Sequence, residues 1–253
     1  MSNVIISVKG LVKNYGAFEA IKGISFEVSE GEIFGLLGPN GAGKSTTLEI
    51  IETLRDKTSG KIIVDGIDLD THPNEIKKII GVQLQASGFY PGLNLVELIQ
   101  LFSGLYNRNV DALELLDKVN LRDKAKAKVK ELSGGQKQRF SVATTLINKP
   151  KIIFLDEPTT GLDPQARRNL WELIRDIRKA GTTVIITTHY MDEAEYLCDR
   201  VAIMNAGKIV ALASPDKLID DLVATGFERP KEVKQANLED VFISLTGHSL
   251  QEE

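Results

Sequence analysis

The residues GPNGAGKS at positions 38–45, called the phosphate loop below, have the types and spacing needed to hold a chain of phosphates. The glycines let backbone N–H groups approach an anion, Lys44 supplies positive charge for the terminal phosphates, and the Ser45 hydroxyl can bind Mg²⁺. The loop follows an apolar run at 33–37 and opens a predicted helix, whose dipole also favours an anion there. The predicted nucleotide-contacting residues are Gly38, Pro39, Asn40, Gly41, Ala42, Gly43, Lys44, Ser45 and Thr46.

A second apolar run, KIIFLDE at 151–157, ends in two carboxylates. Beside bound phosphates, Asp156 suits the Mg²⁺ shell and Glu157 could polarise an attacking water. The phosphate loop also occurs in GTPases, which would be expected to carry an NKxD guanine reader. The nearest string, NKPK at 148–151, lacks the aspartate and precedes a strand, so we interpret it as a turn.

The string LSGGQ at 132–136, called the signature segment below, precedes another predicted helix. Ser133, Gly134, Gly135 and Gln136 therefore lie where the N–H groups of a helix start can hold a second anion. Two phosphate-binding helix starts far apart in one chain need an explanation. Together with the phosphate loop and the acidic pair, this string resembles the ABC ATPase family, whose signature it is.

The resemblance implies how the phosphate loop and the signature segment come together in one ATP site. In that family the signature of one subunit closes on the γ-phosphate held by the phosphate loop of another. A single chain would then form a homodimer, or a heterodimer with a related ABC ATPase subunit. The implied activity is hydrolysis of ATP with Mg²⁺ to ADP and phosphate, coupled to separate integral membrane permease subunits.

Further positions match the family one by one. Tyr15, in KNYG, matches the aromatic residue that stacks on adenine. Gln85, in IGVQLQ, matches the glutamine that contacts Mg²⁺ and the permease, with Gln83 as a nearby alternative. Asp163, in TGLD, matches the D-loop aspartate, and His189 matches the switch histidine that contacts the γ-phosphate. The implied metal ligands are Ser45, Gln85 and Asp156, and the implied catalytic residues are Glu157, His189 and Lys44.

Within the family, residues 187–204 and the string NLEDVFISLTG at 237–247 resemble exporters of the drug-resistance type. A drug or a small amphipathic or lipid-like molecule is the expected cargo, although the segment before 237 is shorter than in those relatives. The alternative is a non-transport ABC ATPase such as an iron–sulfur-assembly scaffold. DNA-repair ATPases are disfavoured because no heptad repeat separates Lys44 from Asp156, and two-cassette translation factors because the chain has one set of motifs. Glu157 and His189 together disfavour a regulator that only binds nucleotide.

Composition narrows the setting. The chain has 253 residues, 42% hydrophobic and 26% charged, with a net charge of −4, which predicts a globular protein without the basic field that recruits nucleic acid. Its one cysteine, Cys198, cannot form an internal disulfide and is expected to pack in the core. No secretory signal pattern opens the chain, and no window approaches the ~18–20 apolar residues of a membrane helix. The expected location is cytoplasmic, bound to the inner face of the membrane through the permease.

These residues need a framework to position them. Apolar runs alternating with helical stretches predict an α/β P-loop fold around a mainly parallel sheet. Residues 1–30 read as short strands and Asp65-Gly66 as a hairpin turn, which adds an antiparallel arm. Helical patterns are predicted at 44–55 and across 96–146, within a helical subdomain at about 86–150. Asp163, Pro164 and Gly181 mark the cap, start and stop of another helix.

The end of the chain follows a different pattern. SPDKLIDDLVATG at 214–226 has a serine cap, a proline start and a glycine stop, and residues 237–247 repeat the helical pattern. The predicted division is an ABC ATPase cassette over residues 1–213 and a short helical C-terminal extension over 214–253.

Overall fold

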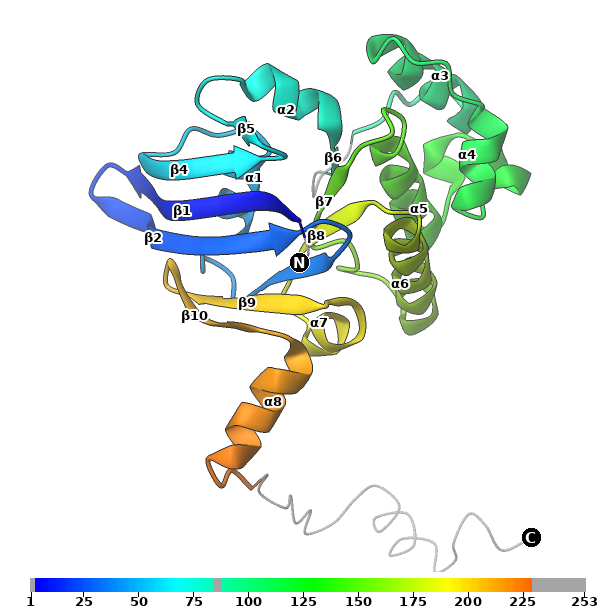
Figure 1. Ribbon diagram of the computed structural model, residues 1–253. Helices are drawn as coiled ribbons and strands as arrows, with labels where there is room; N and C mark the ends of the chain where they lie inside the picture. Colours follow the sequence, from blue (N-terminus) through cyan, green and yellow to red (C-terminus); the bar gives the residue numbers. More distant parts are fainter. Residues whose placement is uncertain (1–2, 84–87, 229–253) are drawn as a thin grey trace, which may run out of the picture. The chain divides into compact units, whose positions relative to one another are not determined.

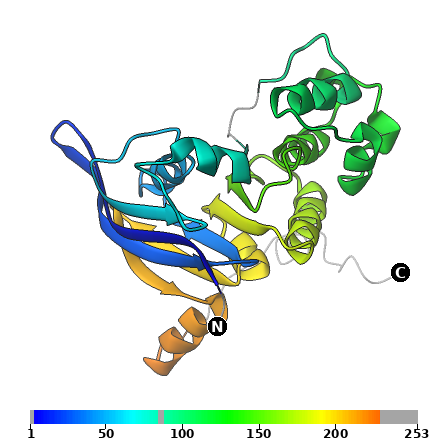
Figure 2. The ribbon, with the colours of Figure 1, turned by 45° about the horizontal axis from the view of Figure 1, so that its top comes forward.

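The computed structural model describes residues 3–83 and 88–228 (Figures 1 and 2). The strands are β1 (Val4–Tyr15), β2 (Phe18–Ser29), β3 (Ile33–Leu37), β4 (Ser59–Val64), β5 (Ile67–Asp68), β6 (Ile80–Gln83), β7 (Ile152–Asp156), β8 (Thr183–Thr188), β9 (Arg200–Asn205) and β10 (Lys208–Ala213). The helices are α1 (Lys44–Ile51), α2 (Pro73–Ile79), α3 (Leu95–Leu105), α4 (Ala112–Lys118), α5 (Gly134–Thr145), α6 (Pro164–Lys179), α7 (Met191–Leu197) and α8 (Pro215–Ala224). Two 3-10 turns, η1 (Arg122–Lys124) and η2 (Val129–Glu131), lie between α4 and α5.

A six-stranded sheet in the order β10-β9-β3-β8-β7-β6 forms the centre of the first compact unit, residues 1–218. Its strands from β9 to β6 are parallel, and only β10 runs antiparallel to its neighbour. Strand β3 is buried along its whole length, as its apolar run predicts. Because side chains alternate across a strand, Phe34 and Leu36 enter one core while Ile33 and Leu37 enter another.

The two cores lie on opposite faces of this sheet. The first core lies between the six-stranded sheet, α1 and the antiparallel arm. The arm is a second sheet with the strand order β2-β1-β4-β5. The other core is covered by α3 to α7, so the helical subdomain packs on the face that the arm leaves free (Figures 1 and 2). The α/β fold with an antiparallel arm and a helical subdomain is confirmed.

The arm differs from the prediction in its length. Residues 4–29 form two 12-residue strands rather than the short strands that were predicted. β1 and β2 pair along most of their length, and register shifts let them bend without ending. Ile24, Phe26 and Val28 alternate inward as expected, and Asp65 and Gly66 make the predicted turn with φ angles of 50° and 76°.

Helix α1 ends at Ile51, four residues before the predicted end. Thr53 adopts a left-handed φ of 64°, its N–H donates to the Ile50 carbonyl, and the Leu54 N–H donates to the Glu49 carbonyl. This pair of bonds is a Schellman cap, which usually has glycine at the left-handed position. Because threonine takes the place of this glycine, the sequence carried no signal for the end of α1.

Helix α6 begins and ends as predicted. The Asp163 carboxylate accepts the Ala166 N–H at 2.8 Å, Pro164 is the first helical residue, and Gly181 follows with a φ of 97°. Cys198 is buried as expected, and burial raises the pKa of its thiol. A Cβ on Gly35 would lie 2.7 Å from the Cys198 sulfur, which explains a glycine inside β3.

Helix α8 has the predicted start, because the Ser214 hydroxyl accepts the Lys217 N–H at 3.3 Å. A second unit begins at Ile219, and residues 229–253, which include the predicted helix at 237–247, lie outside the described residues. The division of cassette and extension at 213/214 stays a prediction. Among the helices of the described residues, none combines the length and apolar character needed to cross a membrane.

The helical subdomain meets the sheet at Gly81 of β6. A Cβ at this position would lie 2.2 Å from the Thr145 carbonyl oxygen at the end of α5. Asn148 secures the same junction, since its side-chain amide donates to the Ile80 carbonyl at 2.8 Å. We expect Gly81→Ala to lower the free energy of unfolding by about 1–3 kcal/mol, because backbone atoms must move apart. Urea unfolding measures this loss.

The matched control is Gly104→Ala in α3, where a Cβ would meet nothing within 4 Å and helix propensity favours alanine. It should cause no loss of stability. Equal stability of the two variants would show that β6 and α5 can separate without cost.

Candidate functional site

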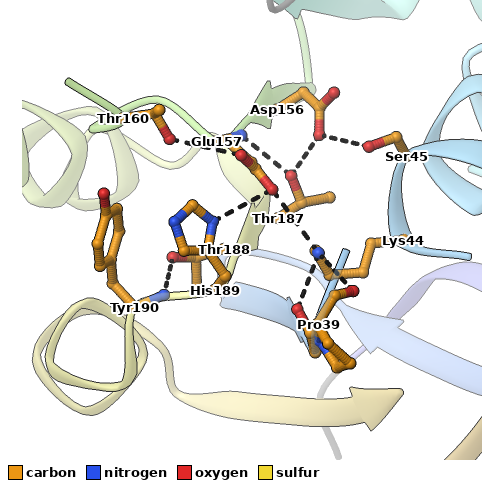
Figure 3. Close-up of polar contacts among 11 residues, drawn as sticks. Pro39, Lys44, Ser45, Asp156, Glu157, Thr160, Thr187, Thr188, His189 and Tyr190 are labelled. Atoms are coloured by element: carbon orange, nitrogen blue, oxygen red, sulfur yellow. Dashed lines mark hydrogen bonds and ion pairs between the residues drawn. The ribbon is translucent and has the colours of Figure 1, made fainter. Parts of the chain in front are cut away.

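Three parallel strands bring the predicted catalytic residues to one edge of the sheet. The phosphate loop follows β3, Asp156 and Glu157 end β7, and His189 follows β8. β8 lies between β3 and β7, and parallel strands end at the same edge, which is where ligands bind in open α/β sheets. Figure 3 shows the resulting cluster, in which Lys44, Glu157 and His189 face one another.

The shape of the phosphate loop depends on its glycines. A Cβ on Gly38 would lie 2.2 Å from the Met204 carbonyl oxygen, so only glycine fits between the loop and β9. Gly43 precedes α1 in a left-handed conformation with a φ of 102°, and a Cβ there would lie 3.0 Å from the Ala20 carbonyl oxygen. The loop therefore packs against the arm and the sheet, with the N-terminus of α1 behind it.

Lys44 is only 4% exposed, and its ammonium group is held from three sides (Figure 3). It donates to the carbonyl oxygens of Gly38 at 2.8 Å and Pro39 at 3.2 Å, and it lies 3.6 Å from a Glu157 carboxylate oxygen. A buried cation needs such partners to offset its lost hydration. The positive charge is therefore fixed inside the loop rather than swinging on a free side chain.

Glu157 has a backbone conformation that non-glycine residues seldom adopt, with a φ of 46°. Its N–H donates to the Thr187 carbonyl at 3.2 Å and to the Thr187 hydroxyl at 3.0 Å, and these bonds hold the turn. Its carboxylate oxygen Oε1 also lies 3.3 Å from His189 Nδ1, without hydrogen-bond geometry. One carboxylate thus faces both Lys44 and His189.

Asp156 makes a different set of contacts. Its Oδ1 accepts the Ser45 hydroxyl at 3.1 Å and also the Thr187 hydroxyl (Figure 3). Hydroxyl and carboxylate oxygens are the ligands that Mg²⁺ prefers, and Mg²⁺ usually takes only one or two protein carboxylates. Within residues 3–83 and 88–228, no cluster of three or more His, Cys, Asp or Glu side chains could hold a metal. The Ser45–Asp156 pair therefore fits a Mg²⁺ ion that takes its other ligands from phosphates and water.

Tyr15 lies at the end of β1 on the antiparallel arm and is 40% exposed. Lys13 Nζ lies 5.1 Å and the Arg55 guanidinium carbon 5.5 Å from its ring centroid. The ring thus makes cation–π contacts with side chains of β1 and of the turn after α1, and keeps a large exposed surface.

The signature segment is held at the start of α5. Ser133 and Gln136 form a capping box: the Ser133 hydroxyl accepts the Gln136 N–H at 3.3 Å, and the Gln136 side chain accepts the Ser133 N–H at 2.9 Å. A Cβ on Gly135 would lie 2.7 Å from Ala166 Cβ, so this glycine lets α5 approach α6. Both hydrogen bonds of the capping box join residues within the signature segment, and neither involves Lys44 or Glu157. A Cβ on Gly134 would lie near Leu162 of the D-loop.

Gln85 lies outside the described residues, so its role as a Mg²⁺ ligand stays a prediction. The alternative, Gln83, ends β6 with its side chain 3% exposed, and its Oε1 has no hydrogen-bond partner in the described part of the chain. Asp163 caps α6, as described above, and does not contact Lys44.

Several residues of the site were not found from the sequence. Thr187 joins Asp156 to the Glu157 backbone, and the Thr160 hydroxyl donates to Glu157 Oε2 at 3.4 Å. Glu52 lies at the end of α1, where burial and the negative charges of Asp156 and Glu49 raise its pKa to about 8. A threonine or glutamate inside an apolar run was the only available signal, and such residues are too common to single out.

Comparisons with known proteins agree with this geometry. The sequence pattern of the ABC transporter family matches residues 21–160. The Nod factor export ATP-binding protein I of Rhizobium etli is 42% identical over 223 residues, covering 86% of this chain and 71% of that protein. The linearmycin resistance ATP-binding protein LnrL of Bacillus subtilis is 38% identical over 223 residues, covering 86% and 72%.

Among solved structures, the ATP-binding cassette MJ0796 in a dimeric post-hydrolysis state bound to ADP and Pi is 29% identical, with a TM-score of 0.75. The match covers 83% of this chain and 98% of that one. The family pattern spans more than half of the chain, and the relatives match it across both the phosphate loop and the signature segment. The chain therefore belongs to the ABC transporter family, as an ATP-binding and ATP-hydrolysing subunit that works with membrane permease subunits.

Proposed function

We propose that this chain drives export through a separate permease by hydrolysing Mg·ATP between two ABC ATPase subunits. The observation that carries the proposal is the convergence of Lys44, Ser45, Asp156, Glu157 and His189 at one edge of the sheet, with the signature segment held apart on α5. Together these side chains supply groups that can bind phosphate and Mg²⁺, accept a proton from water, and stabilise the charge on the γ-phosphate. The names of the two curated relatives, Nod factor export and linearmycin resistance, support export.

The phosphate loop holds the triphosphate. Its backbone N–H groups and the N-terminus of α1 face the phosphates, and the Lys44 ammonium offsets the charge of the β- and γ-groups. Ser45 and Asp156 hold Mg²⁺, with Gln85 as a further ligand. When bound, Mg²⁺ neutralises charge on the phosphate oxygens.

Glu157 acts on the attacking water as general base, and His189 stabilises the γ-phosphate in the transition state. The 3.3 Å separation of Glu157 Oε1 from His189 Nδ1 supports this assignment, since both groups must reach the same phosphate. The Thr187 bonds to the Glu157 backbone fix the carboxylate in a strained turn, which suits a group that must be placed accurately.

The signature segment of one subunit completes the site of its partner. Ser133, Gly134, Gly135 and Gln136 offer a helix start to the γ-phosphate held by the opposite phosphate loop, and Asp163 faces the same interface. The dimeric form of the related MJ0796 cassette supports this arrangement. A homodimer and a heterodimer are both compatible with one set of motifs per chain.

The cargo is a drug or a small amphipathic or lipid-like molecule, which the permease selects. This choice follows the exporter-like residues 187–204 and 237–247 and the two named relatives. The chain itself lies at the inner face of the membrane by way of the permease, and nucleic acid is not a partner.

Tyr15 provides the adenine platform. Stacking on an aromatic ring is worth about 1–3 kcal/mol per base, so Tyr15→Ala should raise the KM for ATP about tenfold with little change in kcat. Tyr15→Phe and Tyr15→Trp are the controls, since both keep a ring, and should leave KM within about threefold. Steady-state ATPase kinetics measure all three. An unchanged KM in Tyr15→Ala would move the adenine platform elsewhere.

The central test of the mechanism replaces Glu157. Glu157→Gln removes the base but keeps size and hydrogen-bonding capacity, so kcat should fall at least about 100-fold while ATP still binds. ATP then stays between the phosphate loop and the opposite signature, and size-exclusion chromatography with Mg·ATP should show a dimer. Adding Ser133→Arg should remove that dimer, because bulk and charge enter the contact with the γ-phosphate.

Glu114→Gln, an exposed glutamate on α4, is the matched control and should alter neither activity nor assembly. Normal hydrolysis by Glu157→Gln would refute the catalytic assignment. An inactive Glu157→Gln protein that binds ATP and stays monomeric would refute the shared site instead.

A further inference from the structure

Glu193, on α7, is a fully buried glutamate that the mechanism above does not use. Its Oε1 accepts the indole N–H of Trp171 on α6 at 3.0 Å. Burying a carboxyl group is costly, and the apolar side chains of Ala194 and Leu197 already bury α7 in the same core. A residue that served packing alone would not need a carboxyl group here.

Residues of two loops act on Glu193: the loop after β7, called the Glu157 loop below, and the loop after β8, called the His189 loop. Burial raises the pKa of Glu193, and the polar side chains of Thr188, Trp171 and Thr159 lower it. Thr188 immediately precedes His189, and Thr159 lies two residues after Glu157. The Thr188 hydroxyl also accepts the Tyr190 N–H at 3.0 Å, so it fixes the backbone on both sides of His189 (Figure 3).

Part of this cluster is not satisfied. Glu193 Oε2 and the Thr159 hydroxyl are both buried, and neither has hydrogen-bond geometry with any residue that the structure describes. Burying polar groups together is costly unless they interact, so the electrostatic effect of Thr159 and Thr188 on Glu193 matters for both loops.

Arg167 joins the same cluster to the D-loop. It lies one turn into α6, where its N–H donates to the Asp163 carbonyl at 3.0 Å. Its guanidinium carbon lies 4.6 Å from the ring centroid of Tyr190, and it donates to Asp192 at 3.3 Å. Its positive charge also acts on Glu193.

We propose that Glu193 is a positioning residue, which ties the Glu157 loop and the His189 loop to α6 and so sets the geometry of hydrolysis. The proposal rests on the roles proposed above for Glu157 and His189. Glu193 is fully buried and acts through Thr188 and Thr159 of these loops. Removing it should therefore change the alignment of the reacting groups more than the affinity for ATP.

The test compares variants of the full-length chain in steady-state hydrolysis of Mg·ATP. Glu193→Leu keeps the approximate volume but removes both oxygens, and misplaced catalytic groups should lower kcat about 10- to 100-fold with KM within about threefold. Glu193→Gln keeps an acceptor for Trp171 and a donor for Thr159, so it should retain kcat within about threefold.

Two further variants control for folding and for local charge. Trp171→Phe removes the indole donor while it keeps an aromatic ring, although a smaller one, and should lower kcat in the same direction, by at least about threefold, so it decides the question if Glu193→Leu does not fold. Glu195→Gln, an exposed glutamate two residues along α7, should have wild-type kinetics. Trp171 is the one tryptophan of the chain, so its fluorescence reports on the Glu193 contact directly.

Mg·ATP should shift Trp171 emission in the wild type and in Glu193→Gln, and the shift should be absent in Glu193→Leu. Wild-type kcat in both Glu193→Leu and Trp171→Phe, or an effect confined to KM, would overturn the proposal. Glu157→Gln is measured in parallel. If it alone abolishes hydrolysis, only the role of Glu193 fails; if it is active, the proposed catalytic site fails first.

Discussion

The carboxylate of Glu157 faces the Lys44 ammonium at 3.6 Å and the His189 imidazole at 3.3 Å, and this contact depends on the arrangement of the sheet. The three groups come from loops after β3, β7 and β8, so their approach requires these strands to be parallel and to end together. At an effective dielectric constant of about 20, the Lys44–Glu157 charge pair is worth about 4 kcal/mol before the cost of desolvation. That energy is available only inside a rigid frame, which the doubly buried sheet provides.

The two cores on opposite faces of the sheet carry different parts of the nucleotide site. The arm and α1 support the phosphate loop on one face, where Gly38 and Gly43 permit backbone contacts that any side chain would block. The helices on the other face support the signature segment, where Gly135 lets α5 approach α6. The glycines of the phosphate loop and of the signature segment lie on opposite faces of the sheet. In both places the missing side chain lets the segment at a helix start pack closely against a neighbouring element.

The sequence predicted the placement of the site residues better than the lengths of the elements. Motif spacing and apolar runs place Asp156 and His189 at strand ends and Lys44 and Ser45 at the start of a helix, and the structure brings the four together, although their chemical roles stay proposals. The cap of α6 was predicted because Asp163 and Pro164 are strong local signals. The length of β1 and β2 and the stop of α1 at Thr53 were not, since bulges and a left-handed threonine leave no compositional trace. Glu193 was missed for a related reason. Its proposed role depends on Trp171 and Thr159, which lie 22 and 34 positions away in the sequence and come near Glu193 only when the chain folds.

The γ-phosphate of ATP and the Glu157 carboxylate are two anions that would compete for the Lys44 ammonium. A γ-phosphate that binds Lys44 brings negative charge to the place that the Glu157 carboxylate now shares, so the carboxylate must yield part of its contact with the ammonium. Glu157 sits at a left-handed φ, Thr187 holds its backbone N–H, and the Thr160 hydroxyl donates to its Oε2. Thr159, between Glu157 and Thr160 in the chain, is fully buried. A displacement of the Glu157 carboxylate therefore requires the packing of this loop to change, which is why we expect Glu193 to influence hydrolysis more than the affinity for ATP.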